Sequence, residues 1–178
     1  MRLVTDRTTG LALGRPQNWH QLKPSAFDLV MVHDDPSRPE NVFQPNVVAT
    51  VVPVGDAATV AAFTKSSMSA WLRLVPTGHV VAIDYYSADS LEARRVISYY
   101  DEQGVGVTMA SFCFVHAALA TRVDISFGVW NTADGLRESD HIMQSFEAPK
   151  AFAEASALET GDRVGVFPFL KGLISRGR

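Results

Sequence analysis

Residues 99–130 read YYDEQGVGVTMASFCFVHAALATRVDISFGVW and contain two β-patterned runs joined by the short segment at residues 116–120. In the second run apolar and polar residues alternate, which is the period of a strand with one face toward solvent. The first run is apolar on both faces, as in a strand inside a sheet. The stretch therefore predicts a long antiparallel hairpin with Ile125 and Phe127 in the core, facing a helix. The alternating residues are Val123, Ile125, Phe127 and Val129 against Arg122, Asp124, Ser126 and Gly128.

Two further strands are expected directly before the hairpin, at residues 79–86 and 93–101. Turns are expected between them at residues 87–90 and before the hairpin at residues 103–104. Four consecutive strands with short connections form an antiparallel meander. The predicted sheet therefore has this meander as its main part.

The N-terminal part adds strands at residues 2–5, 27–32 and 47–54. Residues 10–23 predict an extended or turning segment, because Gly14 and Pro16 disfavour a helix there. Trp19 is the expected anchor of this segment.

Two helices are expected to cover the sheet. The first is capped by Asp56 or Thr59 and stopped by Pro76 and Gly78. Its expected apolar stripe is Val60, Phe63, Ser67, Trp71 and Leu74, and its outward face carries Lys65, Ser66, Ser69 and Arg73. The second starts near Thr132, Asp134 and Gly135, carries Leu136, Ile142, Met143 and Phe146, and ends at Ala148 and Pro149. The predicted fold class is α+β, an antiparallel meander covered by helices in an αβα-type sandwich.

The length of 178 residues suits one domain, which we assign to residues 1–149. A net charge of -3 gives no basic surface for a polyanion, so no nucleic-acid partner is expected. The single cysteine, Cys113, lies in the expected central strand and predicts a buried thiol rather than a disulfide or zinc ligand. No apolar run suits a signal peptide or membrane span, so we expect a cytoplasmic protein without membrane insertion.

Residues 150–178 form an apolar and basic C-terminal extension. Its last part, RVGVFPFLKGLISRGR at residues 163–178, is too apolar for a solvated terminus. We expect it to be covered by the chain's own sheet edge, by a second copy in a homodimer, or by an outside partner. The partner-contacting residues expected in this extension are Val166, Phe167, Phe169 and Leu170.

The most polar cluster after an apolar strand is His33, Asp34 and Asp35. One histidine with two carboxylates is compatible with metal binding or acid–base chemistry, and it supports a small hydrolase as an alternative function. The alternative interpretation is structural, because Asp-Asp-Pro is a common way to end a strand in a turn. His79, His116 and His141 are expected at the surface, near element ends.

Four tyrosines lie on what should be adjacent strands, where cross-strand pairing would stiffen the sheet or line a groove. They are Tyr85, Tyr86, Tyr99 and Tyr100, and we take Tyr86 and Tyr99 as candidate partner-binding residues. Arg94 and Arg95 are expected to be exposed charges beside the intervening turn. The sequence contains no nucleophile elbow, dinucleotide fingerprint or P-loop, so it assigns no catalytic, cofactor-binding or metal-binding residue.

Three segments and the order of the elements resemble the PsbP-like superfamily. The segments are GRPQNWHQLKP at residues 14–24, FQPNVVATVVPV at residues 43–54 and HIMQSFEAP at residues 141–149. The superfamily includes photosystem extrinsic proteins, a nuclear Ran-binding factor, type VI secretion adaptor chaperones and LpqN-type lipoproteins of actinobacteria. The resemblance, over residues 11–149, implies a non-enzymatic binding or adaptor protein without a cofactor. The implied partner is a protein or an apolar peptide segment, held by a sheet face or groove.

Overall fold

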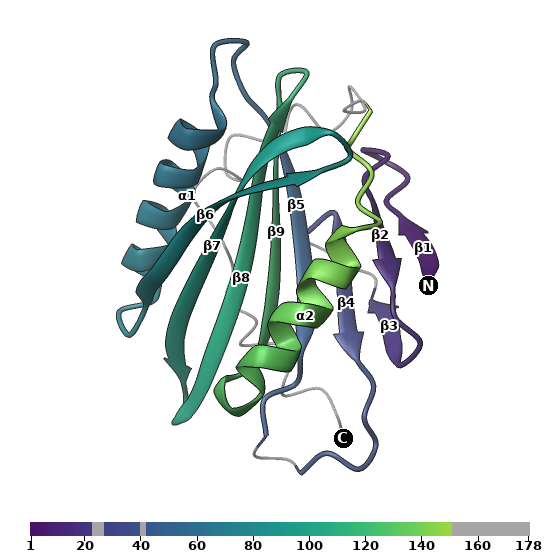
Figure 1. Cartoon of the computed structure of the whole chain (residues 1–178), viewed down its shortest axis with the longest axis vertical. Coiled ribbons are helices and arrows are strands. Elements are labelled where there is room, and N and C mark those ends of the chain that lie inside the picture. Colours follow the sequence, from purple (N-terminus) through teal and green to yellow (C-terminus); the bar gives the residue numbers. More distant parts are fainter. Residues whose placement is uncertain (23–26, 40–41, 151–178) are drawn as a thin grey trace.

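The computed structural model of the chain describes residues 1–22, 27–39 and 42–150. In these residues, seven strands form one antiparallel sheet in the order β3-β4-β5-β9-β8-β7-β6 (Figure 1). The strands are β3 (Trp19–Leu22), β4 (Leu29–His33), β5 (Asn46–Pro53), β6 (His79–Ala88), β7 (Leu91–Glu102), β8 (Val105–His116) and β9 (Leu119–Gly128). A separate two-stranded sheet pairs β1 (Arg2–Thr5) with β2 (Ala12–Arg15).

The predicted meander is confirmed as β6 to β9. Each of its three hairpins turns on two residues, and both residues of every turn have positive φ. Such turns match the right-handed twist of the paired strands, which fixes the register. The turn pairs are Asp89-Ser90, Gln103-Gly104 and Ala117-Ala118. The strand β8 is confirmed as an interior strand because it lies between β7 and β9.

Helix α1 (Val60–Leu74) packs against β7 and β8 on one face of the sheet. Helix α2 (Thr132–Met143) follows the short 3₁₀ helix η1 (Val129–Asn131) and crosses the opposite face, which it shares with β1 and β2 (Figure 1). The hydroxyl of Thr59 caps α1 by accepting a hydrogen bond of 3.2 Å from the Ala62 amide. The expected sandwich of helices on both faces of an antiparallel sheet is therefore confirmed.

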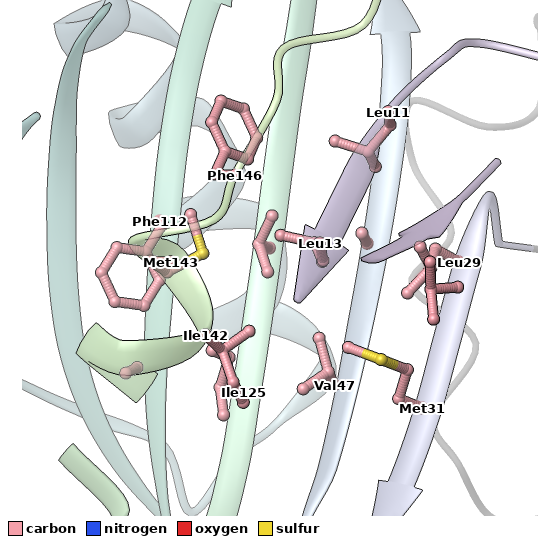
Figure 2. Packing of buried hydrophobic residues seen from close by; sticks show 14 of the residues in the cluster. Leu11, Leu13, Leu29, Met31, Val47, Phe112, Ile125, Ile142, Met143 and Phe146 are labelled. Atoms are coloured by element: carbon pink, nitrogen blue, oxygen red, sulfur yellow. The ribbon is translucent and has the colours of Figure 1, made fainter. Parts of the chain in front are cut away.

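The main hydrophobic core lies between the sheet and the layer formed by α2, β1 and β2. Figure 2 shows Ile142 and Met143 of α2 close to Phe112 and Ile125 of the sheet. Ile125 and Phe127 are each 2% exposed, so their predicted place in the core is confirmed. At Gly135 the helix comes so near that an added Cβ would lie 2.4 Å from the Phe127 ring. A larger residue at this position would therefore have to displace the Phe127 ring where α2 crosses β9.

The solvent-facing side predicted for β9 is wrong, because every residue of this strand is buried. Arg122 is 1% exposed and Asp124 is 9% exposed. The Nε of Arg122 donates to Oδ1 of Asp124 at 2.7 Å, and the Ser111 hydroxyl donates to the same oxygen at 2.6 Å. The Arg122 Nη1 also donates to the Ser67 carbonyl of α1 at 3.5 Å. The polar residues of β9 thus face α1 instead of solvent, and Arg122 and Asp124 neutralise each other there.

The segment at residues 10–23 is extended where the structure describes it, as expected, and forms the strands β2 and β3. Trp19 is buried, also as expected, and donates a hydrogen bond of 2.9 Å to Glu138 of α2. Two smaller expectations need correction. Val129 lies in η1 and is 39% exposed instead of continuing β9. Leu74 is also exposed, because the buried face of α1 includes Thr64 and Met68 instead of Val60 and Leu74. That face consists of Thr64, Ser67, Met68, Ala70 and Trp71.

Neither of the described helices is both long and apolar enough to cross a membrane. Residues 151–178 lie outside the described residues, and with them Val166, Phe167, Phe169 and Leu170. The boundary after residue 149 and the role of the extension stay predictions.

Candidate protein-binding surface at the edge of the sheet

Strand β6 forms one edge of the main sheet, and within the described residues only β7 pairs with it. Its outward-facing backbone N–H and C=O groups are therefore unpaired there. Three large apolar side chains are exposed along this strand: Val81 at 69%, Ile83 at 58% and Tyr85 at 80%. We call these three residues the β6 row.

The β6 row is exposed because α1 stops short of it. Ile83 and Tyr85 lie opposite Val96 and Arg94 of β7, on the face that α1 covers further along the sheet. The helix packs on β7 and β8, so Val96 is fully buried while Ile83 is not. Edge strands usually carry lysine or proline, which prevents pairing with other chains. The sequence of β6, HVVAIDYYSA, contains neither, and its protection is a bulge between Val80 and Ala82.

An ionic cluster fixes the other face of β6 to α2. The Nη1 of Arg95 lies 3.0 Å from Oδ1 of Asp140, and its Nη2 lies 3.2 Å from Oδ2 of Asp84. Tyr86 packs edge-on against Phe112 with ring centroids 4.8 Å apart. Burial and then the negative charge of Asp140 raise the pKa of the Tyr86 hydroxyl, while Arg95 opposes this shift. The strand is therefore held on the side away from the β6 row.

A shallow hollow of about 470 Å³ lies at the end of β6 and is lined by Tyr85, Tyr86 and Ser87. Successive side chains of a strand point to opposite faces, so a hollow lined by three consecutive residues lies along the strand's edge. The Arg94 guanidinium carbon is 3.6 Å from the Tyr85 ring centroid, and Arg94 Nη1 is 3.1 Å from Glu92. This stacking holds the Tyr85 ring beside the hollow.

The structure separates the two tyrosines chosen from the sequence. Tyr86 lines the hollow and pairs with Ala93, whereas Tyr99 pairs with His79 at the opposite end of the hairpin. The six residue steps from 93 to 99 correspond to about 20 Å of strand. Cross-strand pairing among the four tyrosines is not found in the described residues. Three of the rings contact other residues instead, Tyr85 with Arg94, Tyr86 with Phe112 and Tyr100 with Trp71.

Two side chains taken as turn charges in fact lie within the sheet. Arg94 and Arg95 belong to β7, and the turn consists of Asp89 and Ser90. Val81 and Ile83 were not predicted as surface-binding residues from the sequence. The available signal was the alternation of Val81, Ile83 and Tyr85 in a run without lysine, but alternation alone does not say which face a helix will cover.

The cluster at His33 forms a strand end, as the structural interpretation predicted. The backbone amide and hydroxyl of Ser37 donate to Asp35 Oδ1 at 3.0 and 2.6 Å. Both hydrogen bonds lower the pKa of Asp35, and the bond from the Ser37 hydroxyl has the larger effect. His33 packs edge-on against Trp19, and its carbonyl accepts from the Gln44 amide at 2.9 Å. Among the described residues, no group of three His, Cys, Asp or Glu side chains is placed to hold a metal ion.

No known protein family profile matches the sequence, and no curated protein matches it significantly. Solved structures do resemble the fold. LpqN of Mycobacterium tuberculosis, described as involved in cell envelope biogenesis, aligns with a TM-score of 0.65 at 16% identity, covering 84% of this chain and 90% of that one. Cyanobacterial PsbP of Synechocystis sp. PCC 6803 aligns with a TM-score of 0.61 at 11% identity, covering 83% and 91%.

The Ran-binding protein Mog1p of Saccharomyces cerevisiae aligns with a TM-score of 0.58 at 8% identity, covering 83% of this chain and 94% of that one. These three proteins are the kinds of structure that the sequence resemblance named. The chain therefore has the PsbP-like fold. At such identities the likeness establishes the fold alone, and the site must be argued from this chain's own residues.

Proposed function

We propose that this protein is a non-enzymatic binding or adaptor protein that holds an extended segment of a protein partner along the edge of β6. The observation that carries the proposal is the β6 row, Val81, Ile83 and Tyr85, beside backbone groups that have no partner in the described part of the chain. An added strand would pair with these groups, and its alternate side chains would cover the row.

The chemistry expected of the partner follows from the surface. The row is apolar, and the acidic groups beside it, Asp84 of β6 and Glu92 of β7, are already paired with Arg95 and Arg94. An extended segment with apolar residues at alternate positions therefore fits better than a charged one. Mog1p, which shares the fold, is described as a Ran-binding protein, so one relative of this architecture binds a protein.

Three earlier expectations stay proposals alongside this one. Tyr86 would contact the partner at the hollow, and Tyr99 would need a second contact about 20 Å away. The extension residues Val166, Phe167, Phe169 and Leu170 would form a further contact region. A cytoplasmic location stays a prediction that cell fractionation would test. For the hydrolase alternative, the described residues around His33 and Asp35 offer a turn and no converging catalytic groups.

The test combines capture from the native host with hydrogen exchange. We expect wild-type protein to retain a partner that Ile83→Lys loses, while Leu72→Lys keeps it. Leu72 is a matched control because it is 41% exposed but lies on α1. In the complex, the amides of β6 that face the edge should exchange more slowly than in the free protein diluted until it is monomeric. Equal capture by Ile83→Lys, or unchanged exchange in β6, would overturn the proposal.

A further inference from the structure

The β6 row is self-complementary. We propose that a second copy of this chain pairs with β6 in antiparallel orientation, around a two-fold axis at Ile83, and so covers the row when no other partner is bound. The inference rests on the proposed function in one respect, which is that β6 is the edge where binding occurs.

The register follows from the order of side chains. With the axis at Ile83, this residue faces Ile83 of the partner subunit, and Val81 faces Tyr85 of the partner subunit. All six side chains of the two rows then lie on one face and cover one another, as aromatic and β-branched cross-strand pairs do. An axis at Asp84 would instead place two carboxylates opposite each other. An axis at Tyr85 would set Ile83 against Ser87 and Val81 against Asp89.

Charge does not oppose this pairing. The ionisable side chains of β6 are His79 at its start, Asp84 and the two tyrosines. Asp84 points to the α2 side, where Arg95 pairs with it at 3.2 Å. Two edges can therefore approach without bringing an unpaired charge against the apolar row. The net charge of -3 adds only weak, screened repulsion between copies.

The bulge limits how far the pairing extends. The register with β7 shifts between Val80 and Ala82, and a bulge increases the local twist of its strand. Regular pairing is thus confined to residues 82–84 in each copy, and the contact of Val81 with Tyr85 of the partner subunit lies at the end of this segment, at the bulge. A two-fold interface of this kind is isologous, so it closes as a dimer and does not grow into a filament. Its shortness also makes it exchangeable, so an outside segment can displace the second copy.

The experiment measures mass and proximity on the full chain. Light scattering over a range of concentrations should show the mass rising from 19.4 kDa toward twice that value. Ile83→Lys should remain at the monomer mass, and Leu72→Lys should behave as wild type. Under mild oxidation Ile83→Cys should form a cross-linked dimer, whereas Leu72→Cys should not. Circular dichroism confirms that each variant is folded.

A further pair of variants tests the register. Val81→Cys and Tyr85→Cys should cross-link to each other when mixed, and each should cross-link poorly with itself. The native Cys113 does not interfere because it is fully buried. A monomer at every concentration, or a dimer that survives Ile83→Lys and cross-links equally at Leu72, would overturn the inference.

The outcomes also separate this inference from the proposed function. A monomeric wild type whose captured partner is lost in Ile83→Lys would refute the dimer and keep the adaptor proposal. Cross-linking in the stated register, with no outside partner that protects β6, would support the dimer and refute the adaptor proposal.

Discussion

Arg122 and Asp124 lie two residues apart on β9, point to the same face, and form an ion pair of 2.7 Å that is buried beneath α1. Ser111 of the neighbouring strand donates to the same carboxylate oxygen. Two charges thus occupy a layer between helix and sheet that apolar side chains usually fill. Removing either residue of such a pair destabilises the fold, because the other is then buried without its counter-charge.

We expect Asp124→Ala to lower the free energy of unfolding by about 3 to 5 kcal/mol, since it leaves the Arg122 guanidinium in a low-dielectric layer without its carboxylate. Urea denaturation measures the loss. The control is Asp134→Ala, which breaks the exposed ion pair with Arg137 on α2 and should cost less than about 1 kcal/mol. Equal losses in the two variants would show that the buried pair is not important for stability.

Phe127→Ala should destabilise the protein by about 3 to 5 kcal/mol, because the ring is 2% exposed and packs against α2. Gly135→Ala should cost about 1 to 3 kcal/mol on its own, since the new methyl group would meet that ring. The double variant Phe127→Leu/Gly135→Ala should lose less free energy of unfolding than Phe127→Leu and Gly135→Ala lose separately when their losses are added. Thermal melts of the set test this, and strict additivity would mean that helix and ring do not press on each other.

Cys113 should react slowly with thiol reagents in the native protein. Burial raises the pKa of its thiol to about 11, although the Arg122 charge acts in the opposite direction. Little thiolate is therefore present at neutral pH, and access requires unfolding. Labelling kinetics with and without urea measure this, and fast native labelling would contradict the expected burial.

The same thiol makes stability depend on alkaline pH. The folded state keeps its proton up to about pH 11, while the unfolded thiol loses it near pH 9. The folded state thus binds more protons than the unfolded state between pH 9 and 11. The thiol's contribution to the free energy of unfolding is therefore complete below pH 9 and is lost as pH rises from 9 to 11. Two pKa units correspond to about 2 to 3 kcal/mol. We expect Cys113→Ala to show a shallower decline between pH 9 and 11 than wild type, and parallel curves would refute the assignment.

Deleting residues 163–178 should change the mass, the stability or the partner binding of the protein, because so apolar a segment needs cover. Loss of folding would indicate docking on the chain's own surface, and conversion of a dimer to a folded monomer would indicate docking between copies. Cross-linking through Ile83→Cys should persist in the deleted protein, since that pairing uses β6. If mass, stability and binding are all unchanged, the extension is dispensable.

The central hairpin was predictable from sequence because β8 is apolar on both faces, which suits only an interior strand. The same reasoning failed for β9. Arg122 and Asp124 alternate with apolar residues as solvent-facing residues do, and periodicity cannot show that each supplies the other's counter-charge under a helix. The strands β2 and β3 were missed because each spans four residues beside Gly14, Pro16 or a turn, too short for a periodic signal.

The candidate surface was only partly predictable. The sequence singles out Tyr86 because tyrosines on adjacent strands can line a groove, and this residue does line the hollow. Val81 and Ile83 were taken as ordinary strand residues, because exposure at an edge depends on where α1 ends across the sheet. The pairing of Arg95 with Asp84 and Asp140 joins the β6–β7 hairpin to α2, and Asp140 lies 45 residues from Arg95 in the sequence. No local pattern could have predicted that these residues meet.

The two-residue turns of the meander have a consequence for how the chain folds. Strands β6, β7 and β8 each pair with the next strand in sequence, so their contacts close short loops quickly. Strand β5 instead pairs with β9, bringing Val47 opposite Ile125 across the whole helix and meander. Closing so long a loop costs more entropy, and β5 can pair only after β9 has formed. The β5–β9 contact is therefore expected to form late, as a seam between the N-terminal strands and a meander that is already assembled.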